Sequence, residues 1–167
     1  SSLRFLLLRG RGRHFSAGAD LAWMQQSAQL DFNTNLDDAH ELGELMYALH
    51  RLKAPTLAVV QGAAFGGALG LISCCDMAIG AEDAQLCLSE VRIGLAPAVI
   101  SPFVVKAIGE RATRRYALTA ERFSGVRARE LGLLAEVYPA HELDAHVEAW
   151  VANLLLNSPQ ALRASKD

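Results

Sequence analysis

The chain of 167 residues is 51% hydrophobic and 20% charged, so it can bury one substantial core, and its composition argues against disorder. A formal net charge of −2 argues against nucleic acid or an acidic membrane surface as a partner. The three cysteines are odd in number and include the sequence neighbours Cys74 and Cys75, which cannot easily bridge to each other. We therefore expect reduced thiols and an intracellular, cytoplasmic protein.

The first half of the chain predicts alternating strands and helices. Residues 3–9 form a continuous apolar run that suits a buried strand. Residues 35–53 carry apolar side chains at the three-and-four spacing of an amphipathic helix. Residues 56–60 are rich in β-branched and apolar side chains and predict a second strand. Glycines then interrupt the pattern before a small-residue helix that runs to about residue 75, and residues 77–81 predict a third strand.

The second half is predicted to be mostly helical. Residues 85–88 suggest a short edge strand, and Ser101 with Pro102 begins a helix that ends at Gly109. Residues 133–138 predict one more strand, and further helices are expected over residues 110–120, 127–131 and 142–156. The order of elements indicates a single α/β domain with a mostly parallel sheet. Because the chain opens on a strand and stops inside a helical stretch, we expect residues to be missing at both ends.

A membrane-spanning helix is the alternative interpretation of residues 56–75. This stretch has no formal charge and contains GxxxG pairs at Gly62/Gly66 and Gly66/Gly70. Pro55 at its start, Gln61 within it and four glycines within nine residues fit a strand, a turn and a buried helix better. We therefore expect no membrane partner.

Two glycine-containing loops, residues 14–20 and 62–70, each follow a predicted strand and open toward a helix. Small residues let a ligand approach the backbone closely. Amide N–H groups at a helix start have no intrahelical partner, so they favour a developing negative charge. These loops could form an oxyanion hole, although a glycine-rich loop taken alone is more often a tight turn.

Three segments resemble, in order and approximate spacing, the blocks of the crotonase (enoyl-CoA hydratase/isomerase) superfamily: HFSAGADL, PTLAVVQGAAFGGALGLISCCDMAI and AQLCLSEVRIGLAP. The resemblance covers nearly the whole chain. It implies a ClpP/crotonase-like fold of stacked ββα units, with residues 1–167 as a catalytic core that lacks N-terminal strands and C-terminal trimerisation helices. It also implies a homotrimer or hexamer. The implied substrate is an acyl-CoA thioester, and no metal or other cofactor is needed.

By the same resemblance, the backbone N–H groups of Ala19 and Gly67 would bind the thioester oxygen. Ala17 would lie along the CoA moiety, and Gly66 and Gly70 would also adjoin the substrate. Glu90 matches one of the family's two catalytic glutamates. The other falls on Gly70, which cannot transfer a proton. This departure leaves three possibilities: a hydratase that uses Glu90 alone, an isomerase with Glu90 as its single base, or a catalytically silent assembly protein.

The finer sequence texture is most similar to methylglutaconyl-CoA hydratases of leucine catabolism and to isohexenylglutaconyl-CoA hydratases. The segments concerned are AGADLAWMQ, AAFGGALGL, SEVRIGLAPAVISP and ERATRRYALTAERF. Substrates of these enzymes carry an extra carboxylate, so the resemblance implies hydration of a branched or dicarboxylic 2,3-unsaturated acyl-CoA. We expect Gly70 to leave space for the branched acyl group or an ordered water. A cation for the second carboxylate could come from Lys106, Arg111, Arg114 or Arg115.

Overall fold

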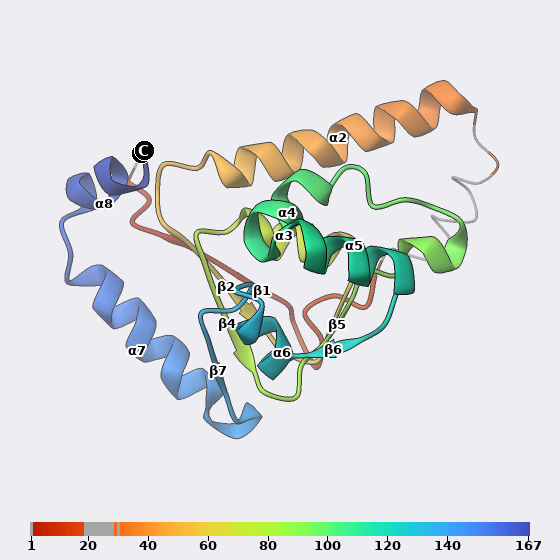
Figure 1. Ribbon diagram of the computed structural model, residues 1–167. Coiled ribbons are helices and arrows are strands. Elements are labelled where there is room, and N and C mark those ends of the chain that lie inside the picture. Colours follow the sequence, from red (N-terminus) through yellow and green to blue (C-terminus); the bar gives the residue numbers. More distant parts are fainter. Residues whose placement is uncertain (1, 19–28, 30) are drawn as a thin grey trace.

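The computed structural model describes residues 2–18, 29 and 31–167, and it arranges their strands in two sheets (Figure 1). The first sheet is parallel throughout and has the order β1-β2-β4-β7. In the second sheet, of order β3-β5-β6, the first pair is parallel and the second antiparallel. The bounds are β1 (Leu6–Arg9), β2 (Thr56–Val60), β3 (Ala63–Phe65), β4 (Met77–Ala81), β5 (Gln85–Cys87), β6 (Phe123–Ser124) and β7 (Glu136–Tyr138).

Helices connect and cover these strands. Asp31 begins the long helix α2 by accepting a hydrogen bond from the Thr34 amide at 2.8 Å. Gly109, at φ 86°, ends α4 and precedes α5, as its position predicted. The α-helices are α2 (Phe32–His50), α3 (Gly67–Cys74), α4 (Ser101–Ile108), α5 (Glu110–Thr119), α6 (Gly125–Glu130), α7 (Leu143–Leu155) and α8 (Pro159–Lys166); the 3₁₀ helices are η1 (Glu90–Ile93) and η2 (Ala140–Glu142).

The chain repeats one path through these layers. It runs along β2 in the first sheet, crosses to β3 in the second, and then forms α3; β4, β5 and η1 followed by α4 repeat the pattern. This is the stacked ββα arrangement that was expected. The membrane-helix alternative for residues 56–75 is wrong, because β2, β3 and α3 divide that stretch. Within the described part of the chain, no helix has the length and apolar character needed to cross a bilayer.

Two predictions about strands need correction. β5 lies between β3 and β6 and is therefore the central strand of its sheet, not an edge strand. Its Leu86 and Cys87 are buried, and the two-residue β6 that covers it is too short to leave a pattern in the sequence. β3 was not predicted, because its three residues, Ala63–Phe65, stand between glycines and looked like part of a loop.

The core lies between the sheets and helices α2, α3 and α4. Every residue of β2 is buried, and on the helical side Met46 of α2, Leu69 and Ile72 of α3 and Ile100 are also buried. The buried cluster joins both sheets to α3, so the N-terminus of α3 is held firmly against the strands that precede it.

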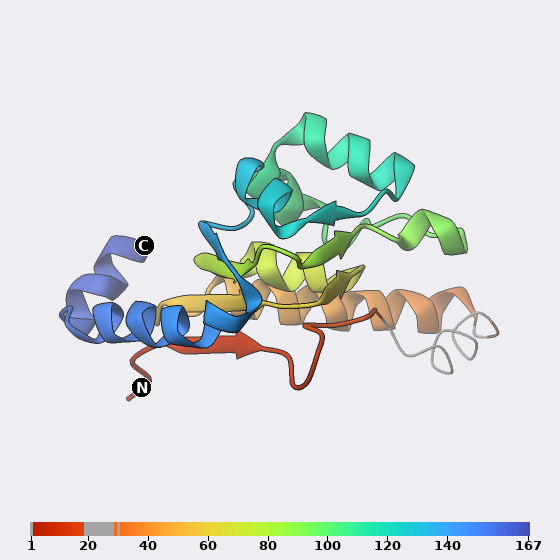
Figure 2. The same ribbon diagram turned by 90° about the horizontal axis from the view of Figure 1, so that it is seen from below.

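The C-terminal helices fold back on the first residues of the chain, so both termini lie at one end of the molecule (Figure 2). The Arg4 side chain donates to the Leu155 carbonyl at 3.2 Å. Lys166 of α8 forms an ion pair with Asp76 at 2.9 Å and donates to the Ala54 carbonyl at 3.0 Å. These contacts dock α8 at the amino ends of β2 and β4. The glycine loop of residues 62–70 follows the opposite, carboxyl end of β2.

Candidate active site

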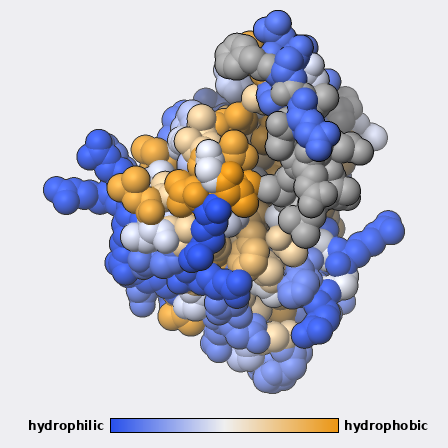
Figure 3. All heavy atoms as spheres, turned by 90° about the vertical axis from the view of Figure 1, so that its right-hand side faces the viewer, coloured by the Kyte–Doolittle hydropathy of each residue, from blue (hydrophilic) through white to orange (hydrophobic). Residues whose placement is uncertain are grey.

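Two predicted site segments meet at the carboxyl ends of β3 and β5. These strands are parallel, and Phe65 pairs with Cys87 in their register. Gly66 and Gly67 follow the first strand, and Ser89 and Glu90 follow the second, so the pairing brings both segments to the same edge of the sheet. Figure 3 looks onto the end of the molecule that carries η1, where hydrophobic surface gathers; Val91, Ile93 and Leu95 are among the exposed large hydrophobic side chains.

Gly66 is in contact range of the Glu90 carboxyl group. A Cβ atom built on Gly66 would lie 3.4 Å from Glu90 Oε1, and the backbone there has φ 62°, a conformation that favours glycine. The Gly66 amide donates to the Cys87 carbonyl at 2.9 Å, so this N–H belongs to the sheet. The role that the structure supports for Gly66 is therefore a close approach of the backbone to Glu90.

Gly67 is the first residue of α3, where an amide has no intrahelical acceptor. Among the described residues, none accepts a hydrogen bond from its N–H. A Cβ atom built on Gly67 would meet no atom within 4 Å, so space is open beside it. A free amide at the positive end of a helix, on a residue with open space beside its Cα atom, is suited to bind an oxygen that gains negative charge.

The Glu90 carboxyl group is partly buried and incompletely paired. Its Oε2 atom is buried and has no hydrogen-bond partner among the described residues. Burial raises the pKa of Glu90 above its usual value, although a hydrogen bond from its own backbone amide partly opposes that effect. A carboxyl group with a raised pKa and an unused oxygen is suited to exchange a proton with a ligand.

This raised pKa predicts a stability effect that depends on pH. At low pH the Glu90 carboxyl is protonated in both the folded and unfolded states, so its burial costs no ionic desolvation. As pH rises above the pKa of the unfolded state, the folded state resists ionisation, so the wild-type protein loses stability. We expect Glu90→Gln to have a higher melting temperature than wild type at pH 8 and a smaller advantage at pH 4. Calorimetry at both pH values checks this, and an advantage that grows toward acid pH would contradict it.

The first glycine loop lies beside β3. Ser16 forms a parallel bridge with Ala64, and the Phe65 amide donates to the Ser16 carbonyl at 2.9 Å. A Cβ atom built on Gly18 would lie 3.9 Å from the Phe65 Cβ atom, and Ala17 is exposed between these positions. The loop therefore arrives at the same sheet edge as Gly67 and Glu90. Ala19, the other predicted amide donor, lies outside the described residues.

The expectation that Gly70 leaves space for substrate is wrong. Gly70 is buried in α3, and a Cβ atom there would lie 2.8 Å from the Ile100 Cβ and 2.9 Å from the Met46 Cε, with Ile100 Cγ2 closer still. The space that a side chain at residue 70 would need is filled by neighbours from α2 and the start of α4. Gly70 is therefore a packing glycine, and its contact with substrate finds no support in this geometry.

We expect Gly70→Ala to destabilise the protein by about 1–3 kcal/mol, because the added methyl group overpacks the core. Gly70→Glu, which adds a carboxylate as well, should prevent folding. The double variant Gly70→Ala/Ile100→Ala should lose less stability than the sum of the two single losses, since the second substitution removes Ile100 Cγ2, which the new methyl group would meet. Denaturant unfolding of the single and double variants measures the coupling, and strict additivity would contradict the packing contact.

Two of the four cations predicted to serve a substrate carboxylate are engaged in ion pairs. Arg114 pairs with Glu110 at 3.6 Å and Arg115 pairs with Glu121 at 2.7 Å, while Arg111 is exposed. Lys106 borders a groove of about 270 Å³ with Ser73 and Asp76, at the end of α3 opposite to Gly67.

A cation that was not predicted contacts the last residue of β3. The guanidinium of Arg122 stacks on the Phe65 ring, 4.9 Å from its centroid. The pairing of Leu86 with Phe123 brings residue 122 beside Cys87. This position depends on the β5–β6 ladder, which the sequence did not reveal.

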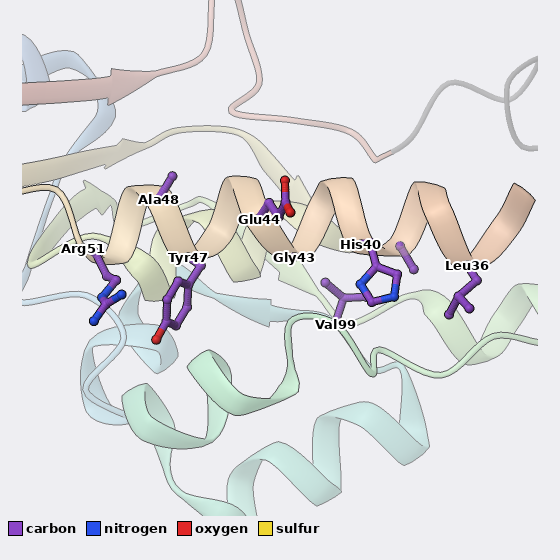
Figure 4. A pocket seen from close by; sticks show the side chains of 9 residues that line it. Leu36, His40, Gly43, Glu44, Tyr47, Ala48, Arg51 and Val99 are labelled. Carbon is purple, nitrogen blue, oxygen red and sulfur yellow. The ribbon is translucent and has the colours of Figure 1, made fainter. Parts of the chain in front are cut away.

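A larger groove, of about 590 Å³, runs along the side of α2 that faces Val99, and Figure 4 shows its lining side chains. Leu36, His40, Tyr47 and Arg51 project from α2, and Val99 comes from the segment before α4. Of the predicted site residues that the structure describes, none lines this groove.

Comparison with known proteins gives one consistent family. A family described as enoyl-CoA hydratase/isomerase matches residues 1–167. An enoyl-CoA hydratase of known structure from Shewanella pealeana is 53% identical, with a TM-score of 0.93 over 98% of this chain and 61% of its own. The likeness confirms the predicted crotonase fold.

Two curated relatives are named for specific substrates. A hydroxycinnamoyl-CoA hydratase-lyase from Pseudomonas fluorescens is 32% identical over 96% of this chain and 59% of its own. A 2,3-dehydroadipyl-CoA hydratase from Escherichia coli is 27% identical over 99% of this chain and 64% of its own. The chain thus spans about three fifths of the length of these relatives.

Proposed function

Because the chain belongs to the enoyl-CoA hydratase/isomerase family, we propose that it adds water across the 2,3-double bond of an acyl-CoA thioester. One observation carries this proposal: the Glu90 carboxyl, with one buried oxygen unpaired among the described residues, adjoins the glycine pair at the start of α3, where the Gly67 N–H has no acceptor and a Cβ atom would meet open space. At one sheet edge, a carboxyl group can transfer the proton between water and C2, and a free amide can stabilise the negative charge that develops on the thioester oxygen.

In the proposed reaction, the Gly67 N–H binds the thioester oxygen and stabilises the enolate that forms when water attacks C3. Ala19 is the second amide donor by family resemblance. Glu90, as carboxylate, takes one proton from the attacking water and then delivers that proton to C2. The hydroxyl ends on C3 and the proton on C2, so the atoms of one water are accounted for, and Glu90 returns to its starting state.

For the substrate, we propose a branched or dicarboxylic enoyl group of the methylglutaconyl-CoA type. The sequence resemblance supports it, as does a relative that is named a 2,3-dehydroadipyl-CoA hydratase, since an adipyl thioester carries a second carboxylate. Gly70 contributes no support, because its surroundings are filled. The exposed guanidinium of Arg122, near Phe65, is a cation that a second carboxylate could approach. We also propose a homotrimer or hexamer, on family resemblance alone.

An enoyl-CoA isomerase is the second candidate, and the lone Glu90 carboxyl favours it. Moving a double bond needs one base that removes a proton at one carbon and returns it at another, whereas the hydratases that the chain resembles use two glutamates. Among the described residues at this sheet edge, Glu90 is the carboxylate that could transfer the proton in an isomerisation or in a hydration.

Isotope labelling separates the possibilities. Purified protein is incubated in H₂¹⁸O with methylglutaconyl-CoA, and separately with a 3-enoyl-CoA. Hydration incorporates one ¹⁸O at C3 and removes the absorbance of the conjugated thioester. Isomerisation of the 3-enoyl-CoA creates that absorbance without ¹⁸O. Turnover of the 3-enoyl-CoA with no ¹⁸O from either substrate would replace the hydratase by the isomerase, and no turnover of either would favour a silent assembly protein.

A further inference from the structure

The first glycine loop joins β3 through an irregular ladder. The Phe15 amide donates to the Gln61 carbonyl at 2.8 Å, and the Ser16 amide donates to the Ala63 carbonyl at 3.0 Å. One step along the loop thus corresponds to two steps along the opposite chain, so that chain carries one extra residue, as in a β-bulge. The extra residue is Gly62, whose φ of 60° is typical of glycine at such a position.

The bulge changes the partner of the Ala63 amide. In a regular parallel ladder, the bridge between Ser16 and Ala64 would be followed by a bond from the Ala63 N–H to the backbone carbonyl of residue 14. Here the Ala63 N–H donates instead to Nδ1 of the His14 side chain, at 2.9 Å. Ala63 is only 9% exposed, so the folded protein would lose stability if the Ala63 amide had no acceptor.

The surroundings keep this contact close. A Cβ atom built on Gly62 would lie 2.6 Å from His14 Nδ1 and would also collide with the Arg13 carbonyl oxygen. Glycine at residue 62 therefore makes room for the imidazole, and the imidazole completes the ladder that the glycine interrupts. Because Nδ1 accepts the bond, the ring nitrogen that carries the proton is Nε2.

We propose that His14 is a positioning residue, which fixes the spacing between the loop of residues 16–18 and β3. β3 ends directly before Gly66 and Gly67, so this spacing sets how far the loop lies from the Gly67 amide. The inference rests on the proposed function for its effect on rate, but the hydrogen bond itself is independent of any activity. His14 acts through the backbone and does not touch the reacting atoms.

Two substitutions of similar size separate the acceptor from the shape of the side chain. Asn places its Oδ1 atom the same number of bonds from Cα as His Nδ1, so His14→Asn can accept the Ala63 N–H. His14→Leu places a methyl group there and cannot. We expect His14→Leu to lower kcat about tenfold to a hundredfold, with KM changed less than about threefold, because misplaced catalytic groups affect the rate more than binding. His14→Asn should stay within about threefold of wild type.

Hydrogen exchange of the Ala63 amide gives a readout that needs no substrate. Exchange should be faster in His14→Leu and close to wild type in His14→Asn. Lys166→Met is the matched stability control: it removes the contacts of Lys166 to Asp76 and Ala54, and it should lower the melting temperature without changing kcat. A loss of kcat in His14→Leu that exceeds the loss in Lys166→Met at comparable stability supports positioning.

Two results would overturn the inference. In the first, Ala63 exchanges at the wild-type rate in His14→Leu, so the imidazole is not the acceptor. In the second, His14→Asn is as impaired as His14→Leu although its Ala63 amide is protected. If the wild-type protein shows no hydratase or isomerase turnover, the proposed function fails, while the exchange experiment still decides whether His14 holds the loop.

Discussion

Glu90→Gln is expected to lower kcat about a thousandfold, within the range of roughly 10² to 10⁴ for loss of a general acid–base group. Glutamine preserves the length and shape of the side chain, but its amide cannot take a proton from water or return one to C2. KM should change little, because the acyl-CoA thioester is held by backbone amides in the proposed mechanism. Steady-state kinetics measures both constants, with the acyl-CoA that the wild-type protein hydrates in the isotope experiment as the substrate.

Glu82→Gln is the matched control, because Glu82 is exposed in the turn between β4 and β5 and lies away from the Gly67 amide. It should keep wild-type kcat. Glu90→Gln that retains more than about a tenth of wild-type kcat would show that another group moves the proton, and Glu90 would then lose its catalytic assignment. A silent assembly protein would show no turnover before the substitution or after it.

Gly67→Pro is expected to lower kcat about a hundredfold to a thousandfold, the usual cost of one oxyanion-hole donor. Proline has no N–H, yet it is well tolerated at the first position of a helix, where the amide has no intrahelical acceptor. The substitution therefore removes the proposed donor and preserves α3. Kinetics together with circular dichroism measures the rate and the integrity of the helix.

Gly67→Ala is the companion variant, because it keeps the N–H and its Cβ meets no atom within 4 Å. We expect any loss in Gly67→Ala to fall mainly on KM, since the methyl group occupies space that the thioester would use, with kcat within about tenfold of wild type. Equal losses of kcat in the proline and alanine variants would mean that the open space matters and the amide does not.

The sequence predicted the parts of the fold that depend on local chemistry. The β-branched run at residues 56–60 gave β2 to the residue, and Ser101 with Pro102 and Gly109 gave both ends of α4. Gly67 and Glu90 were assigned through resemblance, and the parallel pairing of β3 with β5 brings their segments to one edge. The predictions of β2 and α4 succeeded because each signal lies within a few neighbouring residues, whereas the catalytic roles of Gly67 and Glu90 stay predictions.

The parts that failed depend on contacts between distant residues. Gly70 was interpreted as open space because the sequence shows the missing side chain but not Ile100, thirty positions later, which fills its place. The contact of Arg122 with Phe65 depends on the two-residue strand β6, and the bond from Ala63 to His14 depends on a one-residue bulge. Neither feature has a periodic pattern that a single sequence could reveal.

The most direct test of whether Gly67 and Glu90 form one catalytic centre is a crystal structure of the protein with a saturated acyl-CoA. Such a ligand has the thioester but no double bond, so it cannot be hydrated. The thioester oxygen should lie about 3 Å from the Gly67 nitrogen, with the Glu90 carboxylate beside C2 and C3 of the acyl chain. A thioester oxygen bound elsewhere, or a Glu90 carboxylate turned away from the acyl chain, would contradict the assignment of Gly67 and Glu90 to one catalytic centre.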